Sequence, residues 1–102
     1  MPLTRDFKET IRDHVQRDPK FRKELLREGL EAMLTGEMAL AKTILRDYIN
    51  ATVGFAGLAK ATRIPPKSLM RMFGPSGNPR ADNLFEVVSV LQQREGLRFH
   101  VR

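Results

Sequence analysis

Residues 57–74, GLAKATRIPPKSLMRMFG, decide the fold of this chain. They predict two short helices, over 55–61 and 66–73, joined by a tight turn. Ala59 is small enough to lie where two such helices cross at a steep angle. Apolar residues occupy the positions that would lock this pair together, namely Leu58, Ile64, Leu69 and Phe73. The stretch therefore predicts a helix-turn-helix at about residues 55–74.

The second helix of the pair has two contrasting sides. Leu69, Met72 and Phe73 follow the i, i+3, i+4 spacing of a buried face. The opposite side carries two cations four residues apart, with a small polar and a thioether side chain close by: Lys67, Ser68, Met70 and Arg71. A two-turn helix with such an exposed side suits the major groove of DNA, which admits an α-helix.

The excess positive charge is concentrated around this motif. The net charge is +6, from 18 Lys and Arg against 12 Asp and Glu. Ten basic and nine acidic residues nearly cancel over 1–54, and three of each balance over 82–102. The segment from Tyr48 to Ala81 contains no acid, whereas it includes Lys60, Arg63, Lys67, Arg71 and Arg80. A surface facing a polyanion requires this distribution, and a solvated basic face is the alternative interpretation.

The pattern resembles the phage-repressor-like (Xre) helix-turn-helix family. The matching residues are Leu58-Ala59, Thr62, Ile64, Ser68-Leu69 and the GNP sequence at 77–79. The resemblance covers roughly residues 40–101 and implies a helical DNA-binding domain.

Two positions depart from the family pattern. The family usually has glycine where this chain has Arg63, in a turn whose backbone tends to be left-handed. A left-handed Arg costs roughly 1 kcal/mol relative to Gly, which a domain tolerates. Pro65 replaces the usual polar N-cap of the second helix, and Pro66 compensates in part by presetting φ at the first helical position.

These observations predict two kinds of DNA contact. Base contacts are expected from Lys67, Ser68, Met70 and Arg71, and contacts to backbone phosphate from Lys60, Arg63 and Arg80 at the edges of the motif. One short recognition helix covers too few bases to define a site alone. We therefore expect a homodimer on double-stranded DNA, with half-sites about 34 Å apart. The C-terminal segment and the N-terminal helices are alternative dimerisation surfaces.

Further helices are predicted before the motif. A first helix capped by Thr4 has one face made of Phe7, Ile11 and Val15. Asp18-Pro19 begins the next helix, which Gly36 ends and whose inward residues are Phe21, Leu25, Leu26, Leu30, Met33 and Leu34. A third helix is expected over about 37–52, ended by Gly54, with an inward face of Leu40, Ala41, Ile44, Leu45, Tyr48 and Ile49.

A sixth helix follows the motif and its turn-rich loop GPSGNP. It is expected over about 80–93, with the apolar residues Leu84, Val87, Val88 and Leu91. Residues 97–101 alternate apolar and polar side chains and predict a short β-strand. The predicted fold class is all-α, with about six helices and one C-terminal strand in a single domain over residues 1–102.

Composition argues against several other classes of protein. The chain has no Cys, and His14 and His100 lie at opposite ends, so no metal site is expected. No Ser/His/acid grouping, phosphate loop or paired-carboxylate cleft is recognisable, and neither catalytic residues nor cofactors are expected. No apolar run approaches the ~20 residues that span a bilayer, and the N-terminus lacks a secretory signal. A reduced, cytoplasmic protein with no membrane partner is expected.

Residues 1–50 exceed what a minimal helix-turn-helix needs, and they hold most of the acids. Small regulators of this size with a terminal strand resemble the antidote (antitoxin) members of the Xre family. That resemblance implies a small toxin as partner and repression of the protein's own operon. Two alternatives are a stand-alone phage-type repressor without a toxin, and a protein-interaction module that does not bind DNA.

Overall fold

The computed structural model describes residues 12–96. A helical segment over 12–17 leads into five complete helices, which are α2 (Pro19–Leu34), α3 (Met38–Ala51), α4 (Gly54–Thr62), α5 (Pro66–Met72) and α6 (Ala81–Glu95). All regular structure in this part of the chain is α-helical, as the sequence predicts. The expected strand over 97–101 lies outside the described residues, as do Thr4, Phe7 and Ile11.

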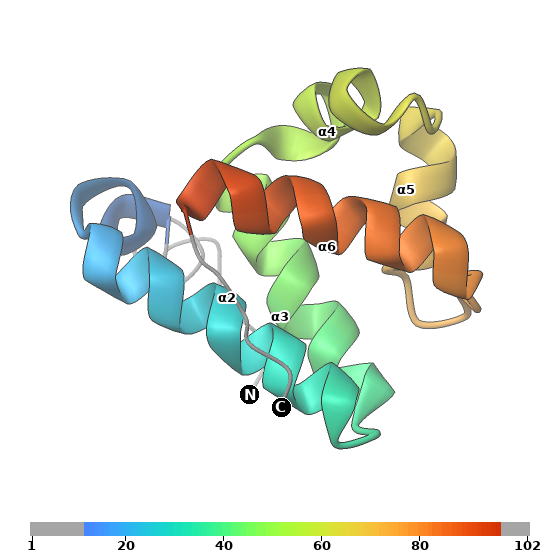
Figure 1. Ribbon diagram of the computed structural model, residues 1–102, viewed down its shortest axis with the longest axis horizontal. Coiled ribbons are helices and arrows are strands. Elements are labelled where there is room, and N and C mark those ends of the chain that lie inside the picture. The colour runs from blue at the N-terminus through green and yellow to red at the C-terminus, as the bar shows by residue number, and fades with distance from the viewer. Residues whose placement is uncertain (1–11, 97–102) are drawn as a thin grey trace.

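The helices form two groups around one core. In Figure 1, α2 and α3 form a helical hairpin, α6 crosses over α3, and the α4–α5 pair lies on the side of the molecule away from α2. Every helix contributes to a single cluster of buried apolar residues, which comprises Leu26, Leu30, Leu45, Tyr48, Ile49, Phe55, Leu58, Leu69, Met72, Phe73, Val87 and Leu91. The helix-turn-helix is therefore held in place by the same core that joins the hairpin to α6.

The start of α2 confirms the predicted cap. The Asp18 carboxylate accepts hydrogen bonds from the backbone N–H groups of Lys20 (3.0 Å) and Phe21 (3.3 Å), and Pro19 is the first helical residue. Val15, in the segment that precedes this cap, is fully buried, as its predicted inward position requires.

Three residues predicted to face inward are exposed instead, so that prediction is wrong for them. Phe21, Leu34 and Leu40 are 38%, 78% and 49% exposed. Phe21 lies in the first turn of α2, and Leu34 and Leu40 flank the turn between α2 and α3. These helix ends extend past the core, because helical periodicity identifies a face but not how far the neighbouring helices cover it.

Gly54 also differs from its predicted role. Helix α3 ends at Ala51 with Thr52 as its C-cap, and Gly54 begins α4 with a φ of +73°. The left-handed conformation that glycine allows is therefore used to start the next helix rather than to close the previous one.

A polar cluster is embedded where α2, α3 and α6 meet. The Glu95 carboxylate accepts hydrogen bonds through Oε1 from Arg22 Nε (2.5 Å) and from the Tyr48 hydroxyl (2.6 Å), and its side chain is 5% exposed. Burial, followed by the hydrogen bond to Glu95, raises the pKa of Tyr48 above its ordinary range. Tyr48 therefore remains a neutral hydrogen-bond donor in the folded protein.

Within residues 12–96, no helix has both the length and the apolar character needed to cross a bilayer.

Candidate nucleic-acid interface

The α4–α5 pair has the geometry of a helix-turn-helix. Its turn consists of residues 63–65, and the two helices run at a steep angle to each other (Figure 1). Leu58, Leu69 and Phe73 are buried in the core cluster, and Ile64 packs against it. Ala59, expected where the helices cross, packs against the same cluster. The predicted locking residues are confirmed in this role.

Arg63 adopts the left-handed conformation that its place in the pattern predicts. Its φ and ψ are 61° and 20°, and it is the only non-glycine residue with positive φ within 12–96. Its backbone N–H donates to the Ala59 carbonyl at 2.8 Å and closes α4. Its side chain is exposed, so this strained turn presents a cation to solvent directly before α5.

Thr62 fixes the turn from the inside. Its buried hydroxyl donates to the Leu58 carbonyl at 2.8 Å and accepts the backbone N–H of Ile64 at 3.3 Å. One side chain thus ties the last turn of α4 to the segment that enters α5, a role consistent with its place among the motif's matching residues.

Helix α5 begins without a side-chain cap, as predicted from its two prolines. Pro65 is its N-cap residue, with φ −57° and ψ 144°, and Pro66 is the first helical residue. The Pro65 carbonyl accepts the Leu69 N–H at 3.0 Å, which is the first hydrogen bond of the helix. The entry is therefore fixed by proline geometry in place of a polar cap.

The two sides of α5 are arranged as the spacing predicts. Leu69, Met72 and Phe73 are at most 8% exposed. Lys67, Met70 and Arg71 are exposed, Met70 by 53% of its surface. Two cations one turn apart and a thioether therefore project from the side of α5 that does not pack on the core.

Ser68 is less exposed than the other residues that are predicted to contact bases. It is half-buried, in a crevice of about 170 Å³ between α5 and the loop that follows it. The crevice is lined by Ser68, Arg71, Met72, Ser76, Gly77, Asn78 and Pro79. The structure therefore groups Ser68 with Arg71 along one edge of the exposed side of α5.

The three predicted phosphate contacts lie before and after α5 along the chain. Lys60 is in the last turn of α4 and Arg63 in the turn, whereas Arg80 is the N-cap residue of α6. All three side chains are exposed. Arg80 differs from the others because its guanidinium lies 3.4 Å from the carboxylate of Asp82.

Most cations of this surface have no acidic partner among the described residues. The ion pairs within 12–96 are Arg22–Glu95, Arg27–Glu24 and Arg80–Asp82. The acid-free stretch of the sequence folds into the end of α3, all of α4 and α5, and the following loop. Its charge is therefore largely unneutralised on one part of the molecule, the condition for attraction to a polyanion.

Sequence reasoning missed two cations that support this region from α3. Lys42 Nζ donates to the carbonyl oxygens of Gly74 (3.4 Å) and Gly77 (2.5 Å). Arg46 Nη1 donates to the carbonyl of Phe73 at 3.3 Å. Both contacts hold the segment directly after α5, because their acceptor carbonyls belong to the C-cap residue of the helix and to the loop. No local sequence pattern predicts a contact between a side chain and a backbone carbonyl about 30 residues away.

Gly77 lies against the end of α5. A Cβ atom at Gly77 would lie 2.0 Å from the Arg71 carbonyl oxygen and 2.8 Å from that of Met72. Position 77 therefore requires glycine because the backbone at the end of α5 leaves no room for a Cβ atom, and not because its φ is unusual.

Comparison with known proteins yields no family model, curated protein or solved structure that matches this chain.

Proposed function

We propose that this protein is a sequence-specific regulator of transcription that binds double-stranded DNA through α5. The observation that carries the proposal is the exposed side of α5, where Lys67, Met70 and Arg71 project from a helix locked against the core by its opposite side. Lys and Arg recognise the acceptor edge of guanine, and a thioether suits the methyl group of thymine. The protein acts by binding, and no catalytic residue or cofactor is part of the proposal.

The surroundings of α5 support the same function. Lys60 and Arg63 precede α5 and Arg80 follows its loop, so cations are available for the phosphates that border a groove. Seven residues of α5 extend for only about 10 Å, at 1.5 Å per residue. Such a helix reads a few base pairs, and we therefore propose a homodimer that binds two half-sites about one helical turn, or 34 Å, apart.

The phosphate contacts can be tested by their salt dependence. A variant that combines Lys60→Ala, Arg63→Ala and Arg80→Ala should bind a mixed-sequence duplex more weakly, with a salt slope reduced by roughly three units. The matched control removes the same charge from the exposed surface of α2 by Lys20→Ala, Lys23→Ala and Arg27→Ala. Fluorescence anisotropy titrations across a salt series measure both slopes. If both variants lost affinity and salt slope to the same extent, DNA binding would depend only on net charge, which would contradict the proposal.

We further propose that the protein is the antitoxin of a toxin–antitoxin pair in the cytoplasm and represses its own operon. The support is the family resemblance, together with a helical hairpin whose α2 lies away from α4 and α5 (Figure 1). Where α2 turns into α3, this hairpin carries acidic side chains beside the exposed apolar residues Leu34 and Leu40. An acidic and apolar surface suits a basic partner and leaves α5 available for DNA.

Co-expression with each adjacent small open reading frame tests the antitoxin proposal. Rescue of growth and co-purification with the neighbouring product are the expected results. If no neighbour is toxic, or a toxic one is neither rescued nor bound, a stand-alone repressor replaces the antitoxin. If the protein binds a neighbour but no duplex, the protein-interaction module is the correct alternative.

A further inference from the structure

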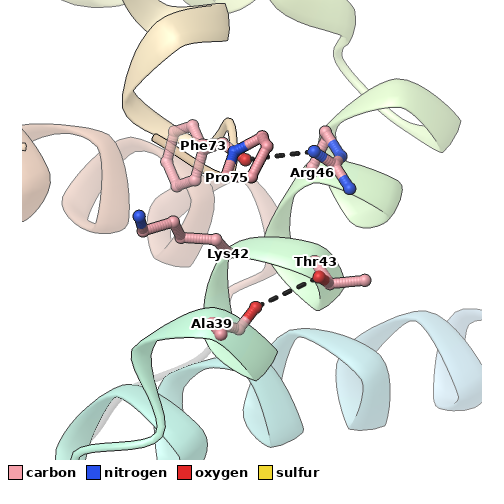
Figure 2. Close-up of a pocket in the computed structure, with 6 residues that line it drawn as sticks. All are labelled: Ala39, Lys42, Thr43, Arg46, Phe73 and Pro75. Atoms are coloured by element: carbon pink, nitrogen blue, oxygen red, sulfur yellow. Dashed lines mark hydrogen bonds between the residues drawn. The ribbon is translucent and has the colours of Figure 1, made fainter. Parts of the chain in front are cut away.

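A pocket opens between α3 and the segment that follows α5. Its volume is about 240 Å³, and it is lined by Ala39, Lys42, Thr43, Arg46, Phe73 and Pro75. Figure 2 shows Lys42 on one side of Phe73 and Pro75, and Arg46 on the other. A water occupies about 30 Å³ in the liquid, so the pocket has ample room for a tetrahedral oxyanion.

The two cations of this pocket lack carboxylate partners in the described part of the chain. Lys42 and Arg46 are half-buried, and no Asp or Glu oxygen within residues 12–96 lies within 4.0 Å of either. They donate to the neutral carbonyls of Phe73, Gly74 and Gly77. Carbonyl contacts orient the two side chains but leave their charges unneutralised, a state that favours binding of an anion.

Donor capacity also remains at this pocket. Arg46 carries five N–H groups, of which the described contacts use one, and its planar fork matches the oxygens of a phosphate. Because the Phe73 carbonyl already fixes the guanidinium, little further ordering is needed when an oxyanion binds.

The pocket lies beside the loop that follows α5, which bears on the kind of oxyanion it would bind. The loop after α5 separates two hollows, since Phe73 and Pro75 line this pocket whereas Ser76 and Gly77 line the crevice beside Ser68 and Arg71. A duplex whose bases meet α5 carries phosphates along both borders of its groove. We infer that Lys42 and Arg46, on either side of Phe73 and Pro75, each contact a phosphate of the DNA backbone, which extends the DNA-contacting surface from α5 to α3. This inference rests on the proposed function.

Single charge-removing variants test the site. Lys42→Gln and Arg46→Gln should each weaken binding to cognate and mixed-sequence duplexes by the same factor and lower the salt slope by about one unit. A four-fold rise in salt should therefore weaken each variant about 3.5-fold less than the wild type. Lys23→Gln, an exposed site on α2, is the control with the same charge change and should retain the wild-type slope. Arg46→Lys keeps the charge and should restore most of the slope.

The same titrations separate phosphate binding from a purely positional role. If the two side chains only hold the loop, their loss should weaken the cognate duplex far more than the mixed sequence, with an unchanged salt slope. That pattern would overturn the inference. Thermal unfolding of each variant identifies any general loss of folding.

A second measurement distinguishes failure of the inference from failure of the proposed function. Titration of the full chain with inorganic phosphate should shift the Arg46 side-chain signals in NMR spectra, and Arg46→Gln should abolish saturable binding. If the wild type binds no duplex while phosphate still saturates the pocket, the proposed function fails and the site takes a free oxyanion instead. If duplex binds with unchanged slopes in both variants and phosphate causes no shift, the inference alone is overturned.

Discussion

Gly77→Ala is the substitution whose effect the structure defines most sharply. The added Cβ would lie 2.0 Å from the carbonyl oxygen of Arg71, whereas Cβ atoms essentially never approach another atom closer than 3.0 Å. The loop must therefore move about 1 Å away from the end of α5. Because both obstructing oxygens belong to the backbone, no side-chain rotation can relieve the contact.

The cost follows from the contacts that this movement disturbs. Overpacking of a well-packed site costs about 1–3 kcal/mol. The displacement also weakens the hydrogen bond from Lys42 Nζ to the Gly77 carbonyl and the bond from the Gly77 N–H to Gly74, each worth about 1 kcal/mol. We expect a loss of about 2–4 kcal/mol in the free energy of unfolding. For a domain of this size that corresponds to a fall in Tm of roughly 10–25 °C.

Gly74→Ala provides a control in the same loop. Its Cβ would lie 3.4 Å from the Arg71 carbonyl oxygen and 3.5 Å from that of Met70, which are ordinary contacts. Neither glycine has a positive φ, so alanine is allowed by the backbone at both positions. Circular dichroism melts of the two variants are the assay, and Gly74→Ala should stay within about 0.5 kcal/mol of the wild type. Equal stability of the two variants, or a larger loss for Gly74→Ala, would refute the reasoning.

The turn, the polar cluster and the proposed dimer each have a measurable consequence. Arg63→Gly relieves the left-handed strain that Arg63→Ala retains, so chemical denaturation should show Arg63→Gly to be more stable than Arg63→Ala by about 1 kcal/mol. Both variants should bind DNA equally weakly. Equal stability of the two variants would contradict the strain argument. Tyr48 is the only tyrosine and tryptophan is absent, so phenolate absorbance reports this side chain alone. Because its pKa is raised in the folded state, its contribution to stability is complete below the unfolded-state pKa of about 10 and is lost as pH rises further. Phenolate should therefore appear only as the helices unfold, and ionisation near pH 10 with intact circular dichroism would be inconsistent with the burial of Tyr48. Sedimentation should show a dimer at micromolar concentration, whereas a monomer whose DNA footprint lacks an inverted repeat would exclude the two-fold arrangement.

The parts of the fold that local chemistry determines could be predicted from the sequence. Asp18-Pro19 marks the start of α2, and the side chains of α5 divide into a buried and an exposed side as their spacing requires. The left-handed conformation of Arg63 was expected from the resemblance, because the family that the pattern resembles usually has glycine at this position of the turn. Each of these features depends on residues no more than seven positions apart.

The features that were wrong or missed depend on neighbours distant in sequence. Phe21 and Leu34 continue the apolar stripe of α2, but they lie beyond the other helices and remain exposed. Lys42 and Arg46 belong to a half of the chain with balanced charge, and only the folded structure reveals that they reach the loop after α5. Periodicity and composition carry no information on where one helix ends relative to another.

The central claim is that the exposed side of α5 reads bases, and selection of bound duplexes from a random-sequence pool tests it most directly. The wild type should enrich an inverted repeat, and Arg71→Ala should lose preference at one base position per half-site, at a cost of about 1–3 kcal/mol on the wild-type site. Lys23→Ala, on the exposed surface of α2, should return the wild-type consensus. A pool that shows no enrichment, or a consensus that Arg71→Ala leaves unchanged at every position, would contradict the claim.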